Sequence, residues 1–346
     1  MQKDERKKQI ITLIESGKEI QLTDILEKWD SFEKRTLIRD LNELLAQNVI
    51  SKRISGKNTF YSINPSYKII KKYDIEEYFS VEYMHRNIID SFNFDIFNLL
   101  KIDLFSGKET EYLNDLHLKF INNLSKYDSQ TLINKEYERI MIEFSWKSSS
   151  IEWNTYSLLS TEALLKNQIK DLTKTPEETQ MILNHKDAFN EIIQNKDSFK
   201  NLSLHNIEYI HSVLTKKIWI TKNIRRSPVR IAWTNYKPLD NEFQINEAMT
   251  DLVNLINNKN SFFEQSFLIL LLLSYIQPFE DWNKRTARTL SNAILLANNS
   301  IPLSYRAIEN VEYIKATILF YEQNNISYFK ELYIAQVEDA VNNFFS

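Results

Sequence analysis

The residues with the clearest chemical potential lie between Gln277 and Arg288, where a long apolar run stops at Pro278. An acidic pair and an asparagine follow, and two arginines three positions apart then open a new helical pattern. The first turn of a helix offers unpaired backbone N–H groups and the positive end of its dipole, and both attract anions. This spacing therefore predicts an anion site at a helix N-terminus, with a carboxylate beside it that can hold a metal ion.

Each polar residue of this stretch has a predicted role. Arg285 and Arg288 lie at positions i and i+3, so they share a helix face and can both reach one polyphosphate. Asp281 stands where a carboxylate can hold Mg²⁺ against phosphate oxygens, and Asn283 can donate an amide N–H to the same anion. The alternative is an ordinary helix start with two surface arginines.

The stretch resembles the signature of the Fic/Doc (Fido) family, His-Pro-Phe-x-Asp-Gly-Asn-Gly/Lys-Arg-x-x-Arg. Gln277 stands at the His position, Trp282 stands at the first Gly position, and Lys284 matches the Doc-like branch. The resemblance implies a protein AMP-transferase, or a related nucleotidyl- or phosphotransferase, that uses ATP or another nucleotide with Mg²⁺. It places Gln277 at the catalytic position and Asp281 at the metal. The implied nucleotide-binding residues are Asp281, Trp282, Asn283, Lys284, Arg285 and Arg288.

Two departures from the signature affect the expected activity. In the family the His takes a proton from the target hydroxyl as it attacks the α-phosphate, and the amide of Gln277 cannot do so near neutral pH. Losing a positioned general base typically lowers a rate by roughly 10²–10⁴. Trp282 puts a large indole into a tight anion loop, where it can fill the pocket or stack on a ligand.

A second motif is Ser148–Asn154, which resembles the family's inhibitory motif Ser-Ser-x-Ile-Glu-Gly-Asn. The resemblance implies that Glu152 pairs with Arg288 and keeps ATP from binding productively. Trp153 replaces the Gly of this motif, and we expect it to face Trp282 and to pack against it.

The segment 224–236 is similar to the family's flap, which clamps a segment of the target protein. Its β-branched residues and Pro228 suggest a short β-hairpin in an otherwise helical domain.

Residues 1–64 predict a separate small unit. Helices are expected at 4–16, 22–29 and 31–47, the last capped by Ser31, and strands at 49–53 and 59–63 around a turn at 55–58. This is the order of a winged helix-turn-helix, and residues 31–41 resemble the recognition helix of DeoR-type regulators. The residues expected to contact DNA are Lys34, Arg35, Thr36, Arg39, Arg53 and Lys57. Residues 31–64 hold only six Lys or Arg against three Asp or Glu, so protein contacts or dimerisation stay open as alternatives.

Composition supports a mainly α-helical fold. Only three glycines occur in 346 residues, so the Gly-rich phosphate loops of Rossmann and P-loop proteins are excluded. Apolar periodicity predicts helices at 202–214, 245–256, 262–276 and 284–297 and from 311 onward, and Thr175 with Pro176 marks another helix start. We expect a winged helix at 1–64, a helical connecting segment at 65–135 and a Fido domain with a hairpin flap at 136–346.

The cysteine content, the net charge and the length of the apolar runs limit the expected compartment and partners. The absence of cysteine fits a reducing cytoplasm, and the net charge of −3 confines any DNA binding to a local surface. The most apolar run, 267–276, has about half the length of a membrane span, so no membrane association is expected. The oligomeric state is open, and the resemblance allows a homodimer.

Three hypotheses of function follow. The first is a transferase for protein AMPylation that Glu152 inhibits and that the loss of the His impairs or redirects. The second is a nucleotide-responsive DNA-binding regulator whose Fido domain is a pseudoenzyme. The third is a scaffold in which these residues are merely structural.

Overall fold

The computed structural model describes residues 3–17, 19–28 and 34–346. The chain divides into two compact units, Met1–Lys72 and Tyr73–Ser346. The three segments expected from the sequence, with limits at 64 and 135, divide the chain more finely than these two units, and that division stays a prediction. Among the described residues, no helix combines the length and the apolar character that crossing a membrane requires.

The N-terminal unit contains four helices and a small antiparallel sheet in its described part. The elements are α1 (Lys3–Gly17), β1 (Ile20–Gln21), α2 (Leu22–Lys28), α3 (Lys34–Ala46), β2 (Ile50–Ser55), β3 (Asn58–Ile63) and α4 (Pro65–Ile70). The strand order is β1-β3-β2, and Ile50 of β2 lies opposite Ile63 of β3. Gly56 has a φ of 62° in the two-residue turn between β2 and β3, a conformation that favours glycine. The expected cap Ser31 lies outside the described residues.

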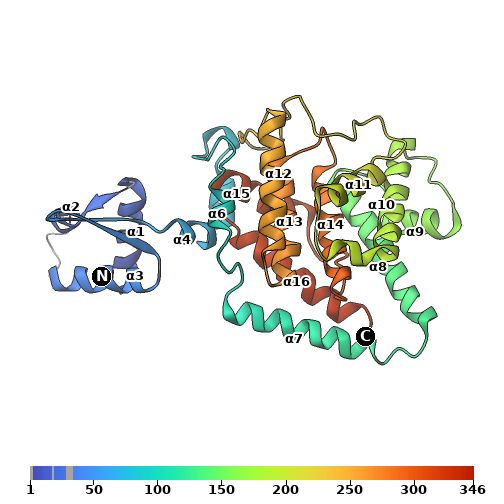
Figure 1. Ribbon diagram of the computed structural model, residues 1–346, viewed down its shortest axis with the longest axis horizontal. Helices are drawn as coiled ribbons and strands as arrows, with labels where there is room; N and C mark the ends of the chain where they lie inside the picture. The colour runs from blue at the N-terminus through green and yellow to red at the C-terminus, as the bar shows by residue number, and fades with distance from the viewer. Residues whose placement is uncertain (1–2, 18, 29–33) are drawn as a thin grey trace. The chain divides into compact units, whose positions relative to one another are not determined.

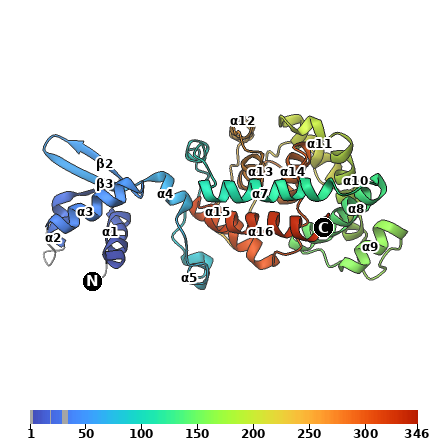
Figure 2. The ribbon, with the colours of Figure 1, turned by 90° about the horizontal axis from the view of Figure 1, so that it is seen from below.

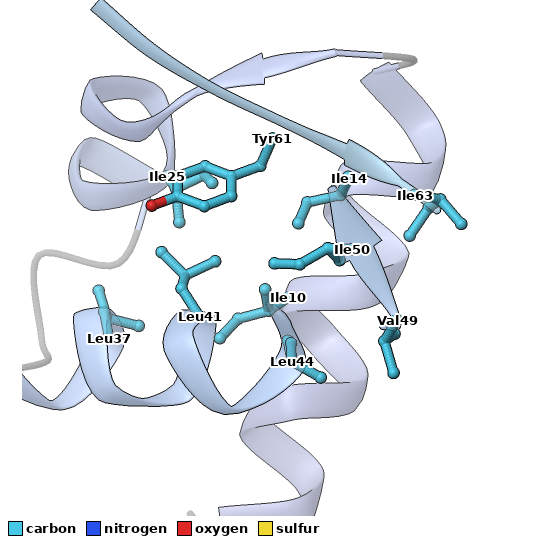
Figure 3. Packing of buried hydrophobic residues seen from close by; sticks show 10 residues of the cluster. All are labelled: Ile10, Ile14, Ile25, Leu37, Leu41, Leu44, Val49, Ile50, Tyr61 and Ile63. Atoms are coloured by element: carbon cyan, nitrogen blue, oxygen red, sulfur yellow. The ribbon is translucent and has the colours of Figure 1, made fainter. Parts of the chain in front are cut away.

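The core of this unit explains why the elements form. Side chains from α1, α2 and α3 meet those of the two long strands, as Figure 3 shows. Ile10 and Ile14 of α1 are one turn apart, so they present one apolar face to Leu37 and Leu41 of α3, and all four are fully buried. The guanidinium of Arg6 pairs with the buried carboxylate of Asp40 and ties α1 to α3.

The larger unit is helical (Figure 1). Its elements are α5 (Ile75–Ser80), η1 (Tyr83–His85), α6 (Ile96–Leu99), α7 (Gly107–Leu124), α8 (Gln130–Ile151), α9 (Leu158–Asn167), α10 (Pro176–Gln194), η2 (Lys196–Phe199), α11 (Leu204–Leu214), α12 (Glu242–Asn257), α13 (Phe262–Ile276), α14 (Asn283–Ala297), α15 (Asn310–Gln323) and α16 (Ser327–Asn343). The expected start at Thr175 is present, because Thr175 Oγ1 accepts a hydrogen bond from the backbone N–H of Glu178 in a full capping box.

Helices α13 and α14 form the centre of this unit. They pack against each other, with α12 beside α13 and with α10 and α11 beside α14. Every residue of α14 except Lys284 is buried. Helix α7 packs against α16 on the outside of the unit (Figure 2). The apolar composition of α13 is thus explained by burial in protein.

The expected hairpin at the flap does not form, and that prediction was wrong. Residues 224–236 contain no strand, and the only pairing nearby is a single bridge between Ser91 and Lys237. The backbone N–H of Arg225 donates to the carbonyl of Pro278 at 2.9 Å, so this part of the flap bonds to the α13–α14 loop instead of to a second strand. Tertiary contacts have overridden the β propensity of the segment.

Candidate functional site

The predicted anion site lies at the loop that joins α13 to α14. The loop begins at Gln277 and ends at Trp282, with φ values of 52° and 67°. Left-handed backbone is rare for residues with large side chains and costs roughly 1–2 kcal/mol for each one. The surrounding contacts must therefore hold both residues in place.

Gln277 is held by hydrogen bonds on both sides of its amide. Its Nε2 donates to the carbonyl of Ser274 at 2.6 Å, and its Oε1 accepts from Asn283 Nδ2 at 2.9 Å. Asn283 also donates to the carbonyl of Phe279 and accepts from the backbone N–H of Phe279, both at 2.9 Å. Donation from Asn283 to an anion, as expected from the sequence, would require this network to open.

The first arginine of the motif packs on the indole of Trp282. The guanidinium carbon of Arg285 lies 3.8 Å from the centre of the Trp282 ring, and Nη2 lies 3.2 Å from Asp281 Oδ1. Trp282 is only 3% exposed, so the indole fills space beneath the arginine, against the ring of His185. The cation–π contact and the ion pair together fix the direction of Arg285.

Glu152 occupies the second arginine. It follows the last residue of α8, and its Oε1 lies 3.0 Å from Arg288 Nη2 while its Oε2 lies 2.8 Å from Lys284 Nζ. Burial opposes the charged form of Glu152, but the positive charges of Lys284, Arg288 and Arg285 outweigh it and lower the pKa of Glu152 to about 2. A carboxylate with this pKa is ionised throughout the neutral range.

Ser148 and His185 are both fully buried, and they form a hydrogen-bonded chain that begins at Arg288. Arg288 Nε donates to Ser148 Oγ at 3.0 Å, and Nη2 donates to the Ser148 carbonyl at 2.9 Å. His185 Nδ1 lies 2.9 Å from the carbonyl of Met181, which can only accept, so Nε2 is the atom that accepts from Ser148 Oγ at 3.1 Å. Burial lowers the pKa of His185 to about 3, and the charges of Arg285 and Arg288 add to that effect. The ring is therefore neutral and suited to this role.

Two donors of the site lack a partner. Arg285 Nε and Arg288 Nη1 are buried and make no hydrogen bond to any residue that the structure describes. A buried guanidinium N–H without an acceptor is costly, so such groups indicate an acceptor that can enter the site. An anion with several oxygens, such as a polyphosphate, matches this donor set.

A small cavity lies beside the anion site. Its volume is about 60 Å³. The aromatic and cationic residues of its wall are Trp153, Trp233, Lys284, Tyr313 and Tyr321. Trp153 is 72% exposed, and it shares no ring contact with the buried Trp282. The expected packing of these two indoles is thus absent, and Trp153 instead borders the cavity with Trp233 of the flap.

Asp281 is placed to contact a metal only together with a ligand. Its side chain is 63% exposed, and in the described part of the chain no group of three or more His, Cys, Asp or Glu converges on one point. Magnesium commonly binds through one or two carboxylates together with substrate phosphates and water. Asp281 beside Arg285 fits that mode, in which the ion would neutralise phosphate charge.

Two further residues hold the loop. Arg225 is 1% exposed, and its guanidinium donates to the carbonyls of Gln277, Ser227 and Leu239, with 2.6 Å to Gln277. Burial lowers the pKa of the Arg225 guanidinium. His211 stacks on Phe279 with ring centres 3.7 Å apart, and its Nε2 donates to the Asp281 carbonyl.

Sequence reasoning missed Arg225, His185 and His211 as residues of the site. Arg225 stands in a basic run that usually indicates a solvated surface, and each His is a lone residue on a helix. Ser148 belongs to the Ser148–Asn154 motif, but nothing in the sequence indicated that its side chain contacts Arg288.

The predicted DNA contacts lie in the N-terminal unit. Lys34, Arg35 and Arg39 of α3 are exposed, and Thr36 is half-buried. Lys57 is exposed in the β2–β3 turn, whereas Arg53 forms a 2.7 Å ion pair with Glu19 and packs on Phe60. Four of the six side chains are thus fully available to a partner.

Comparisons with known proteins identify the type of domain. Residues 201–295 match the model of the Fic/DOC family. Three solved structures, each 18% identical to this chain, have a similar fold. Fic-1 from C. elegans covers 71% of this chain and 79% of its own, with a TM-score of 0.58. No curated protein matches the chain.

The other two structures are bacterial. A Fic domain containing signaling protein from Bacteroides thetaiotaomicron covers 67% of this chain and 94% of its own, with a TM-score of 0.55. A Fic family protein from Desulfovibrio desulfuricans covers 69% of this chain and 74% of its own, also with a TM-score of 0.55. Residues 201–295 thus match the Fic/DOC family model, and this range covers α11, α12, α13, most of α14 and most of the residues of the site.

Proposed function

We propose that this Fic domain binds the phosphates of a nucleotide at the N-terminus of α14 and that Glu152 inhibits it by occupying the same cations. The observation that carries the proposal is the carboxylate of Glu152 between Lys284 and Arg288, at 2.8 Å and 3.0 Å. A carboxylate in this place supports the proposal that the site accepts an anion. A phosphate group would take over the same contacts once Glu152 moves away.

The parts of a nucleotide fit the residues around the site. Phosphate oxygens would accept from Arg285 Nε and Arg288 Nη1, the two buried donors without a partner. Asp281 would hold Mg²⁺, which would neutralise phosphate charge. The base would lie toward Trp153 and Trp233 at the adjoining cavity, where aromatic faces favour a flat ring.

Gln277 limits the chemistry of transfer. Both ends of its amide are engaged, with Ser274 and with Asn283, and neither group can take a proton from an attacking hydroxyl near neutral pH. Phosphoryl and nucleotidyl transfer depend strongly on positioning and electrostatics, which the arginines still supply. We therefore propose a nucleotidyl- or phosphotransferase whose rate is lower by roughly 10²–10⁴ than it would be with a general base.

The test is the intact mass of the protein after incubation with ATP and Mg²⁺. We compare Glu152→Gly with the double variant Glu152→Gly/Gln277→His. Added AMP or phosphate on the single variant supports an active enzyme, and addition on the double variant alone supports an intact site without a base. The control adds Arg288→Ala to the double variant, which must lose the label. The transferase proposal fails if no variant reacts with itself or with added proteins.

A second candidate function is DNA binding by the N-terminal unit, with the Fic domain as a nucleotide-responsive pseudoenzyme. The observation that favours it is the exposed row of Lys34, Arg35 and Arg39 on α3, none of which has an acidic partner among the described residues. A helix with such a row beside a β2–β3 hairpin is the arrangement that a winged helix presents to DNA.

The test of this candidate measures binding to double-stranded DNA at low salt. Changing Lys34, Arg35 and Arg39 to Glu should abolish binding, whereas a control that changes Lys101, Lys108 and Lys126 to Glu has the same net charge and should bind normally. A DNA affinity that also changes with ATP would support the regulator. If the wild-type chain binds no DNA at low salt, this candidate is excluded.

A further inference from the structure

A methionine sulfur lies at the anion site. The chain has no cysteine, so its five methionines carry all of its sulfur, and Met181 of α10 is one of them. Its Sδ accepts a hydrogen bond from Arg285 Nη1 at 3.4 Å and another from Asn154 Nδ2, also at 3.4 Å. A thioether is a weak acceptor, whereas the sulfoxide formed by its oxidation is polar and carries an oxygen. Oxidation of this sulfur would therefore change its contacts with both donors.

The two donors differ in what else holds them. Asn154 follows Glu152 by two positions. Its Nδ2 also donates to the carbonyl of Glu178 at 3.0 Å, and its Oδ1 accepts from the backbone N–H of Tyr156 at 3.0 Å. Asn154 is thus held by bonds that do not involve the sulfur, so Arg285 Nη1 is the donor that responds to a change there.

The space around the sulfur leaves no room for an added oxygen. An N–H···O hydrogen bond alone takes about 2.9 Å between nitrogen and oxygen. The distances from the sulfur to the two nitrogens are 3.4 Å before an S–O bond is inserted. Methionine has three rotatable bonds, so the oxygen can turn toward the donor that binds it more strongly. That donor is Arg285, because a charged N–H forms the stronger hydrogen bond, and its guanidinium must then move.

Hydrogen peroxide is an oxidant small enough to reach this sulfur, since Met181 is only half-buried. The sulfur attacks one oxygen of the peroxide, so the S–O bond forms and the O–O bond breaks. The second oxygen departs as hydroxide and takes the proton of the first, which releases water. The sulfur loses two electrons and the peroxide gains them. The N–H groups of Arg285 and Asn154 lie beside the sulfur and can stabilise the departing hydroxide.

We propose that Met181 is an oxidation site, where peroxide forms a sulfoxide that draws the guanidinium of Arg285 out of its place in the anion site. The sulfoxide oxygen then accepts from Arg285 Nη1, which makes the guanidinium less available to phosphate. Enzymatic reduction of the sulfoxide restores the thioether. The loss of phosphate affinity rests on the proposed function, whereas the oxidation and the movement of Arg285 do not.

The first measurement is a peptide mass map of the full chain after graded treatment with hydrogen peroxide. Met84 is 58% exposed and Met249 is 1% exposed, so these two residues bracket the range of access. We expect Met181 to gain one oxygen at a rate closer to that of Met84, while Met249 stays reduced. If Met181 stays reduced when Met84 is fully oxidised, it is not an oxidation site and the proposal is wrong.

The second measurement follows Arg285 without any ligand, by NMR of protein with isotope-labelled arginine. The variant Arg285→Lys assigns the Nε–H signal. This signal should shift on oxidation in wild type and in Met84→Leu but not in Met181→Leu, which nearly keeps the side-chain volume and removes the sulfur. An unmoved signal in wild type with Met181 oxidised would show that the sulfoxide does not engage the guanidinium, against the proposal.

The third measurement titrates inorganic triphosphate with Mg²⁺ by calorimetry, in the Glu152→Gln protein, where the competing carboxylate is absent. Oxidation should weaken binding about tenfold, and a methionine sulfoxide reductase should restore it. Adding Met181→Leu should make binding insensitive to peroxide. Adding Met181→Gln, whose amide oxygen stands in for the sulfoxide oxygen, should weaken binding without peroxide.

The outcomes of the titration separate this proposal from the proposed function. Equal or tighter binding after oxidation of Met181 would contradict the expected effect on the anion site. If no form of the protein binds triphosphate while the Arg285 signal still shifts on oxidation, the proposed function fails and the oxidation site stands.

Discussion

Removing the charge of Glu152 should strengthen the binding of ATP with Mg²⁺. The variant Glu152→Gln keeps the size of the side chain and removes the anion that Lys284 and Arg288 hold at 2.8 Å and 3.0 Å. The difference between a pKa of about 2 and the ordinary value of 4.5 measures how strongly the site favours the ionised carboxylate of Glu152 over its protonated form. It corresponds to about 3 kcal/mol.

Under the proposed function, a nucleotide must displace that interaction in the wild-type protein. A free energy of about 3 kcal/mol corresponds to an affinity difference of about a hundredfold. This is an upper value, because Lys284 is 31% exposed and its ion pair is screened by water. We expect a gain of about 30- to 100-fold for Glu152→Gln.

Isothermal titration calorimetry at physiological salt measures this gain directly. The matched control is Glu162→Gln, which removes a carboxylate that pairs with Lys166 on the surface of α9. The control should bind ATP as the wild type does. If Glu152→Gln and wild type bind within twofold of each other, or if neither binds, Glu152 does not compete with the nucleotide and the reasoning is refuted.

Three further predictions concern stability. The pKa of His185 in the folded protein is about 3, below the ordinary value of 6.5. Between these two pH values His185 binds a proton only in the unfolded chain, so the free energy of unfolding falls as the pH drops. Between about pH 7.5 and about pH 5 this costs about 2 kcal/mol, and urea unfolding of His185→Gln should show a pH dependence smaller by that amount. Trp282→Gly relieves a φ of 67° but removes a buried indole, so the free energy of unfolding should fall by about 2–4 kcal/mol. An unchanged or higher value in guanidinium unfolding would show that the indole is not packed. Arg225→Met leaves three carbonyls without their donor, and the loss should be about 3 kcal/mol or more, with faster proteolysis of the flap than of α14. Equal cleavage rates in variant and wild type would contradict that role.

The central helices could be predicted from the sequence because local signals and burial agree there. The apolar run ends at Pro278, and α13 has the predicted limits, Phe262–Ile276. Helix α14 begins at Asn283, one residue before the predicted start, because the left-handed Trp282 precedes its first turn. The motif also brought Glu152 together with Arg288, since a family pattern carries information about contacts across 136 residues that periodicity lacks.

The flap shows where local propensity fails. Ile224, Val229 and Ile231 favour strands. However, the backbone N–H of Arg225 donates to the carbonyl of Pro278, and its guanidinium donates to three other carbonyls, so no strand pairing forms. The pairing of Gln277 with Asn283 was also beyond the sequence. Two amides six positions apart meet only because Gln277 takes a left-handed conformation at the end of α13.

The contacts around the anion site differ in how easily a ligand can displace them. The hydrogen bonds of Gln277 and Asn283, and the stack of Arg285 on Trp282, join residues of one loop and its own helix. Breaking the hydrogen bonds of Asn283 leaves backbone groups of that loop unpaired, such as the N–H of Phe279. Glu152 differs, because it lies at the end of α8 and its carboxylate contacts only the side chains of α14. Its departure exposes no backbone donor of the loop, and the phosphate that replaces it satisfies the same cations. For the proposed nucleotide site, we therefore expect a ligand to enter most easily by exchange with Glu152, while the loop keeps its shape.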